Sequence, residues 1–381
     1  MTQRAVFASL VDNVFGNGAA TFDTTVAHSN NVIGALAHPT NFTAFKKNFE
    51  ARLKRLNTAV LIDASLRKEV LAAVNRIADA GWDGAYAELA ALDYFLAEPE
   101  TGPGKILLDR TVPATETLAS EMDMKNANHD MSFPALGVSM DTKLLSDKTG
   151  EILEGIFKEF RSTKGINNLL IVPSYNLDSD FARFSANREA LLKELINCVD
   201  TITQPKGLTS TVIPELSYIF AWSSGVYFGE SSYSPLEHAQ RHHLLLFRHA
   251  KKFSRHEPTV IVFLIFPWSG EKVFPFEDTK RTFFKQFGQH FFNDYLGSSN
   301  SASKYNRKFN SAISADDVTR HLSGVIYLED QAILATNPDQ LNIDASYIWN
   351  ENAINPLFGH LLETIFQRRG AYNLSKYAAG T

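Results

Sequence analysis

A short segment in the first half of the chain carries two aspartates and a lysine at strand spacing. Residues 129–143 read HDMSFPALGVSMDTK, with Asp130 on one side of a turn and Asp141 and Lys143 on the other. Hard divalent cations such as Mg²⁺ take carboxylate and carbonyl oxygens as ligands. A cation held in this way can polarise a phosphate and generate hydroxide. These residue types are therefore those of a metal-dependent phosphodiesterase site.

Strand periodicity predicts that the three side chains share one face of a β-hairpin. Side chains on a strand alternate between faces, and residues 134–137 (PALG) have the composition of a turn. If the apolar face packs in the core, the polar face brings both aspartates and the lysine into one cleft. Alternatively, the segment is an amphipathic hairpin whose polar face is solvated. The polar face would hold Asp130, Ser132, Ser139, Asp141 and Lys143, and the apolar face Met131, Phe133, Val138, Met140 and Leu144.

Each residue of this group has an expected role. Asp130, Asp141 and the main-chain carbonyl of Thr142 would form the protein half of a Mg²⁺ site, in which Mn²⁺ would substitute. Lys143 would hold or help deprotonate the attacking water and offset the charge that builds on the phosphate.

The elements needed to position these residues follow in order along the chain. Residues 84–97 (GAYAELAALDYFLA) predict a helix, and residues 105–110 (KILLDR) predict a strand before the hairpin. Residues 151–161 (EILEGIFKEFR) then predict an amphipathic helix. Residues 168–173 (NLLIVP) form an apolar run of the kind found in a strand buried on both faces. The expected order is αβββαβ.

This order and the aspartates and lysine of the hairpin resemble the PD-(D/E)xK nuclease superfamily. The resemblance implies an α/β, restriction-endonuclease-like fold with a mixed central sheet, and a Mg²⁺-dependent nuclease activity. The sequence departs from the family pattern at His129, where the family has proline, and at Asp141, where glutamate is usual.

The first helix contributes one more candidate residue. Glu88 lies at helical spacing with Ala85, Leu92 and Phe95, so it falls on an apolar face. A buried ionised carboxylate needs a partner or a metal, and family members often carry a glutamate near the metal on this helix. The alternative is a glutamate at the helix boundary that reaches solvent. Asp93 is expected at the surface.

The rest of the chain predicts further globular structure. We expect a mostly helical region over residues 1–80, the nuclease core over 81–200 and an α/β extension over 201–296. Residues 297–381 would form a C-terminal region for recognition or oligomerisation. The fold class that we expect includes an α+β C-terminal extension of the core. The extension includes a buried strand over residues 259–266 and a helix over residues 278–296, whose phenylalanines predict core or subunit contacts.

Composition favours a cytoplasmic protein. The 381 residues include one cysteine, Cys198, which excludes an internal disulfide framework. No signal peptide is evident, and the longest apolar run, residues 260–268, is too short for a membrane span. The net charge of −5 is unusual for a constitutive nucleic-acid binder, so a substrate would need a local basic surface.

Basic and histidine residues cluster around residue 245. Arg241, Arg248, Lys251 and Lys252 would contact nucleic-acid phosphates, or would form an ordinary solvated helix face. Another basic cluster runs from Lys46 to Arg55 and includes Arg52. His238 and His242 have zinc-ligand spacing, but Ala239 stands where the HExxH motif has glutamate.

Three functional hypotheses follow. The first is a Mg²⁺-dependent DNA endonuclease of restriction or anti-phage defence, acting as a homodimer or with a partner protein. The second is a noncatalytic nuclease-fold subunit of a nucleic-acid-binding or defence complex. The third is a zinc-dependent hydrolase.

Overall fold

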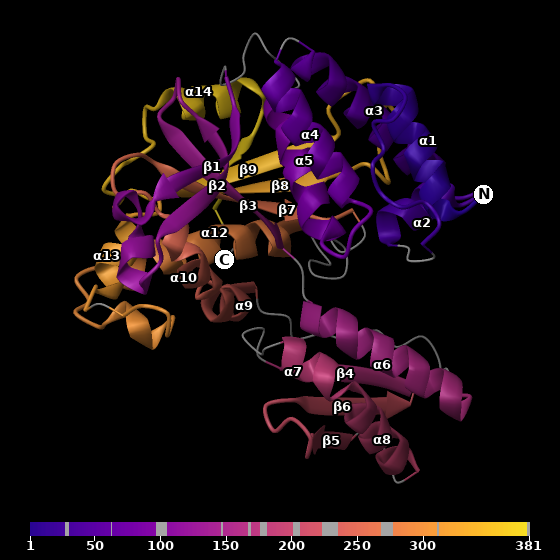
Figure 1. Cartoon of the computed structure of the whole chain (residues 1–381). Coiled ribbons are helices and arrows are strands. Elements are labelled where there is room, and N and C mark those ends of the chain that lie inside the picture. Colours follow the sequence, from indigo (N-terminus) through magenta and orange to yellow (C-terminus); the bar gives the residue numbers. More distant parts are fainter. Residues whose placement is uncertain are drawn as a thin grey trace. The chain divides into compact units, whose positions relative to one another are not determined.

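The chain forms two compact units in the computed structural model (Figure 1). Unit 1 comprises Met1–Leu145 and His243–Thr381, and unit 2 comprises Ser146–His242. The structure describes residues 1–26, 30–61, 63–96, 105–145, 148–166, 169–175, 181–200, 206–222, 235–267, 277–310 and 312–378. Within these ranges, no helix combines the length and apolar character that crossing a membrane requires.

Unit 1 begins with a layer of five helices in the described part of the chain, four of which lie within residues 1–80. Thr2, Asn30 and Asp63 accept hydrogen bonds from first-turn amides and so stabilise three of the helix starts. The last helix is rich in alanine and leucine, which favour helix, and most of its side chains are buried. The helices are α1 (Gln3–Phe15), α2 (Asn31–Ala37), α3 (Thr43–Val60), α4 (Ala64–Arg76) and α5 (Trp82–Leu96).

The centre of unit 1 is a mixed, seven-stranded sheet, as expected for the α/β class. Its order is β1-β2-β3-β7-β8-β9-β10. The β1–β2, β2–β3 and β8–β9 pairs are antiparallel, whereas β3–β7, β7–β8 and β9–β10 are parallel. The strands are β1 (Leu107–Pro113), β2 (Asn126–Phe133), β3 (Val138–Leu145), β7 (Thr259–Ile265), β8 (Gly324–Asp330), β9 (Ile343–Trp349) and β10 (Tyr372–Asn373).

Helices cover both faces of this sheet. The N-terminal helices lie on one side, where α5 packs against β3 and β7, and α12 (Glu277–Asn293) lies on the other side against β8 (Figure 1). The α12 phenylalanines are buried, and Phe284 stacks on Tyr327 of β8 with ring centroids 4.1 Å apart. The prediction that these rings lie in the core is confirmed.

Short elements complete unit 1. Two of them, α10 (Leu245–His249) and η3 (Ala250–Lys252), come just before β7 and matter for the site described below. The others are η1 (Ala114–Glu116), η2 (Leu118–Met122), η4 (Ala302–Lys304), α13 (Ala315–Arg320), α14 (Leu361–Arg368) and η5 (Leu374–Lys376).

Unit 2 has its own core, in which helices cover one face of a three-stranded sheet of order β4-β6-β5. The apolar stripe predicted for residues 151–161 is confirmed, because Leu153, Ile156, Phe157 and Phe160 are buried. Its elements are α6 (Lys148–Lys164), β4 (Leu169–Ser174), α7 (Phe181–Ala186), α8 (Arg188–Val199), β5 (Lys206–Thr209), β6 (Ser217–Trp222) and α9 (Pro235–His242).

The predicted assignment of the second core helix and fourth core strand was wrong. Both segments fold as a helix and a strand, but they belong to unit 2, where β4 pairs antiparallel with β6. The parallel neighbour of β3 is β7 instead. The two strands differ in burial: Leu170 and Val172 of β4 are exposed, whereas every residue of β7 is buried. The compact units consequently do not follow the expected divisions near residues 80, 200 and 296.

A buried ion-pair network joins the helical layer to the end of β8. Arg52 of α3 lies 3.2 Å from Asp93 of α5 and 2.9 Å from Asp330 of β8. Arg55 adds a second contact to Asp93 at 2.7 Å, and the Tyr86 hydroxyl donates to Asp330 at 2.6 Å. Arg52 and Asp93 are 2% and 1% exposed, so their predicted surface positions were wrong. Each charge is buried because the others compensate it.

We predict that Asp93→Ala strongly destabilises unit 1. The substitution leaves the Arg52 guanidinium buried with one partner fewer, which typically costs about 3–5 kcal/mol. Glu50→Ala is the control, since the Glu50–Lys54 pair on α3 is 45% and 63% exposed and a surface pair contributes less than about 1 kcal/mol. Thermal and denaturant unfolding would measure both. Equal, small losses would contradict a stabilising role for the network.

Candidate active site

The hairpin of β2 and β3 forms with the register that the alternating pattern predicted. Its paired residues run from Phe133–Val138 at the turn to Met131–Met140. The turn ends at Gly137, whose φ of 59° suits glycine. One residue beyond the last pair, the Asp130 Oδ2 atom accepts a 2.8 Å hydrogen bond from the Thr142 amide. The Asp130 carboxylate is thereby held beside Asp141.

The two carboxylates face two lysines. Lys143 Nζ lies 2.8 Å from Asp141 Oδ2 and 3.5 Å from Asp130 Oδ2. Lys252 Nζ, from η3, lies 2.8 Å from Asp130 Oδ1 and also contacts Asp141 Oδ1. The structure therefore brings together Asp130, Asp141 and Lys143 and adds Lys252. We call these residues the four-charge cluster.

The carboxyl groups of Asp130 and Asp141 have different pKa values because their surroundings differ. The Asp141 side chain is 0% exposed, and burial together with the neighbouring Asp130 charge raises its pKa to about 6. Asp130 is also desolvated, but Lys143 and Lys252 lower its pKa to about 2. The hairpin's polar face is not a solvated surface, because Ser132 and Ser139 are buried as well. Such a pair of carboxylates with divided pKa values is typical of functional sites.

Lys252 reaches the cluster because the backbone of η3 is attached to β2. The His129 Nε2–H group donates a 2.8 Å hydrogen bond to the Lys252 carbonyl. The amide of Leu118 donates to the next carbonyl, that of Phe253, at 3.0 Å. His129 thus positions Lys252.

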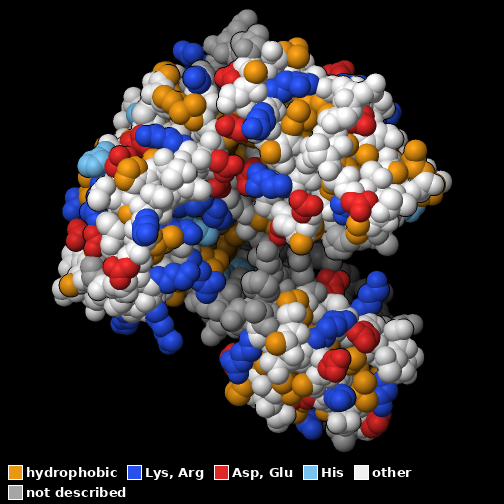
Figure 2. All heavy atoms as spheres, in the orientation of Figure 1, with side chains coloured by type: hydrophobic (Ala, Val, Ile, Leu, Met, Phe, Trp, Pro, Cys, Tyr) orange, Lys and Arg blue, Asp and Glu red, His pale blue; other side chains and the backbone are white. Residues whose placement is uncertain are grey.

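The residues predicted to bind phosphate lie in different environments. Lys252 is engaged inside the cluster, so its assignment to an open basic surface was wrong. Arg248 is exposed and Lys251 is partly buried, with a pKa lowered by burial and by the nearby Lys252 and Lys308 charges. The side chain of Arg241 lies outside the described residues. On the visible face of unit 1, acidic and basic side chains lie next to one another near the middle (Figure 2).

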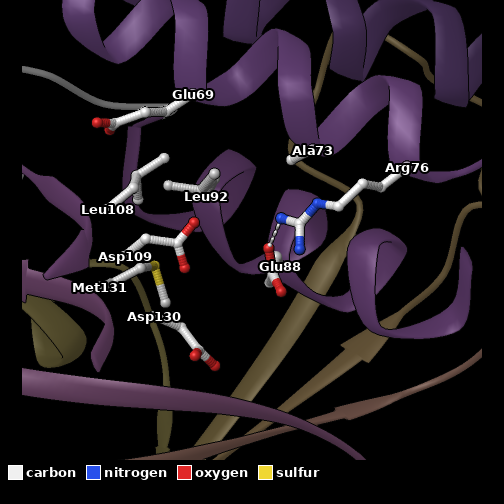
Figure 3. Close-up of a pocket in the computed structure, with 9 residues that line it drawn as sticks. All are labelled: Glu69, Ala73, Arg76, Glu88, Leu92, Leu108, Asp109, Asp130 and Met131. Atoms are coloured by element: carbon white, nitrogen blue, oxygen red, sulfur yellow. Dashed lines mark hydrogen bonds and ion pairs between the residues drawn. The ribbon is translucent and has the colours of Figure 1, made fainter. Parts of the chain in front are cut away.

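Glu88 lies near the cluster but has a different partner. It lines a small pocket together with Asp130 and Asp109 (Figure 3). Its carboxylate is 2.5 Å from Arg76 Nη2 of α4. Burial raises the Glu88 pKa, and the Asp130 charge adds to this effect. Asp109 occupies the left-handed region with φ of 46°, in β1 beside Asp130.

The donors for a divalent cation are present only in part. Asp130, Asp141 and the Thr142 carbonyl offer the oxygens that Mg²⁺ or Mn²⁺ prefers. The carbonyl accepts from Lys143 Nζ at 2.9 Å, and lysines contact both carboxylates. Among the described residues, no three His, Cys, Asp or Glu side chains are grouped as a metal site. The cluster therefore has suitable ligands whose oxygens currently face ammonium groups.

The histidine pair of the zinc hypothesis lies in α9 of unit 2. The rings of His238 and His242 are 4.2 Å apart between centroids and nearly perpendicular, and His242 is buried. No third ligand joins them within the described ranges.

Sequence reasoning missed two members of the site's surroundings. The sequence pattern predicts a surface position for Lys252 and gives no indication of Arg76. Recognising residues 259–266 as the strand beside β3 would have placed η3, and hence Lys252, next to the hairpin. The Arg76–Glu88 contact joins two helices and had no local signal.

In comparisons with known proteins, no family model, no curated protein and no solved structure matches this chain.

We predict that Asp141→Asn changes the pH dependence of stability. The folded-state pKa of Asp141 is raised from 3.8 to about 6, so the folded protein binds the extra proton within this window. As pH rises through the window, the wild type should lose up to about 3 kcal/mol relative to the variant. Denaturant unfolding from about pH 4 to 7 would measure the difference. The control is Glu50→Gln, which alters an exposed carboxylate. A flat difference for Asp141→Asn, or the same pH dependence in both variants, would contradict the assignment.

Proposed function

We propose that this protein is a Mg²⁺-dependent nuclease with a restriction-endonuclease-like core, and that it hydrolyses phosphodiester bonds of DNA. The observation that carries the proposal is the convergence of Asp130, Asp141 and Lys143 on the buried polar face of one hairpin. The order of elements supports it too. Helix α5 and the antiparallel strands β1, β2 and β3 are followed by a parallel strand, β7, beside β3.

Each residue has a role in this proposal. Asp130, Asp141 and the Thr142 carbonyl would hold the cation. A bound Mg²⁺ or Mn²⁺ would polarise the scissile phosphate and lower the pKa of a water. Lys143 would orient the attacking water, because its ammonium already lies within 2.9 Å of the Thr142 carbonyl and close to Asp141. Glu88 would add negative charge at the adjacent pocket once it is released from Arg76.

The substrate would approach over basic side chains near the cluster. Arg248 and Lys251 precede Lys252 on α10 and η3 and would contact the phosphates in this proposal. A net charge of −5 over the whole chain fits a site that depends on such a local surface. A cytoplasmic role in restriction or anti-phage defence, as a homodimer or with a partner protein, is the biological setting that we propose.

A noncatalytic nuclease-fold subunit is the second candidate. The four-charge cluster favours this candidate, because its two lysines already neutralise the charge of its two carboxylates. A site of this kind can be purely structural.

Cleavage assays separate the two candidates. We predict that the wild type converts supercoiled plasmid to open-circular or linear forms with Mg²⁺ or Mn²⁺ and not with EDTA. Asp141→Asn and Lys143→Met should each lower the rate by about a hundredfold or more, since each removes a group that acts on the reacting atoms. Glu50→Gln and Lys54→Met, which alter an exposed carboxylate–lysine pair, are the matched controls.

Two outcomes would contradict the nuclease proposal. One is a wild type that cleaves no plasmid, linear duplex, single-stranded DNA or RNA with either cation. The other is cleavage that survives both site substitutions in folded protein.

The phosphate contacts can be tested by salt dependence. Arg248→Ala and Lys251→Ala should each weaken DNA binding and reduce the slope of log K against log[salt] by about 1, because each removes one phosphate contact. Fluorescence anisotropy with a labelled duplex in EDTA would measure the slope. Unchanged slopes in both variants would exclude this surface.

A further inference from the structure

The ammonium group of Lys252 contacts one oxygen of each of the two carboxylates that would hold a divalent cation. It lies 2.8 Å from Asp130 Oδ1 and contacts Asp141 Oδ1, so it bridges the carboxylates. Lys143 approaches the other oxygen of each carboxylate. The position between the two carboxylates is therefore occupied by the Lys252 ammonium.

The backbone of Lys252 is anchored, whereas its side chain is long. His129 holds its carbonyl, and the adjacent Phe253 is fully buried. The Lys252 side chain is 12% exposed, so it is almost enclosed but not sealed from solvent. Lysine has a flexible four-carbon side chain and a compact, strongly hydrated charge with rotatable donors. The ammonium can therefore leave the carboxylates without any unfolding of η3.

We propose that Lys252 is a positioning residue that competes with the divalent cation for Asp130 and Asp141 and so sets the metal affinity of the site. This inference rests on the proposed function and deepens it. Lys252 keeps the two carboxylates together and compensates their charge when no metal is bound. Mg²⁺ ligates carboxylate oxygens at about 2.0–2.1 Å, which excludes an ammonium from the same bridging position. Metal binding therefore requires Lys252 to move out.

The first test is metal affinity, which does not depend on catalysis. Isothermal titration with Mn²⁺ would compare the wild type with Lys252→Met, after circular dichroism has verified folding. We expect Lys252→Met to bind Mn²⁺ about tenfold more tightly or better. Lys251→Met is the matched control, because it removes the neighbouring positive charge on the same 3-10 turn. A gain of less than about twofold for Lys252→Met, or an equal gain for both variants, would overturn the proposal.

A second measurement uses the wild type alone and covers the case in which Lys252→Met does not fold. Lysine acetylation with acetic anhydride, followed by peptide mass spectrometry, reports the accessibility of each ammonium. We expect Lys252 to be protected in EDTA and to become reactive at saturating Mn²⁺, while the exposed Lys54 reacts equally in both. Protection of Lys252 that persists at saturating Mn²⁺ would overturn the proposal.

These results are distinguishable from failure of the nuclease proposal. Tighter Mn²⁺ binding by Lys252→Met without any cleavage by the wild type would retain the competition and reject the nuclease. Cleavage by the wild type with unchanged Mn²⁺ affinity in Lys252→Met would retain the nuclease and reject the competition.

Discussion

The rest of the site depends on one constraint, which is the burial of the Asp141 carboxylate on β3 of the central sheet. An isolated buried charge costs several kcal/mol, and it persists only where partners compensate it. Lys143 and Lys252 supply that compensation from two different segments. The hairpin register, the Thr142 amide bond to Asp130 and the His129 bond to η3 all keep these groups within reach. Removing any one of these groups or hydrogen bonds would leave another charge buried in the low-dielectric interior with less compensation.

The order of the chain imposes a second constraint. Strands β3 and β7 pair in parallel, although all of unit 2 lies between them in the sequence. Their pairing also brings the η3 turn, and with it Lys252, beside β2. The long separation has a cost in loop-closure entropy, which is offset by a β7 strand that is buried along its whole length. The site is thus assembled only when both parts of unit 1 have come together.

The sequence predicted local features well and long-range pairing poorly. Alternation in residues 129–143 correctly gave the hairpin and the side chains that share its polar face. The helix of residues 84–97 and the strand of residues 259–266 were also correct. Periodicity does not distinguish which apolar run pairs with β3, and the sequence favours residues 168–173, whereas the neighbour of β3 is β7. The same limit hid Asp93 and Lys252, since burial of a charge depends on partners that are distant in sequence.

A crystal structure of the wild type grown with Mn²⁺, with anomalous scattering to locate the ion, would show whether the metal binds Asp130 and Asp141 in place of Lys252. We expect an anomalous peak between Asp130 and Asp141, with the Lys252 ammonium displaced from both carboxylates. An Mn²⁺ peak elsewhere in the molecule, or Lys252 still bridging the aspartates at saturating Mn²⁺, would contradict it.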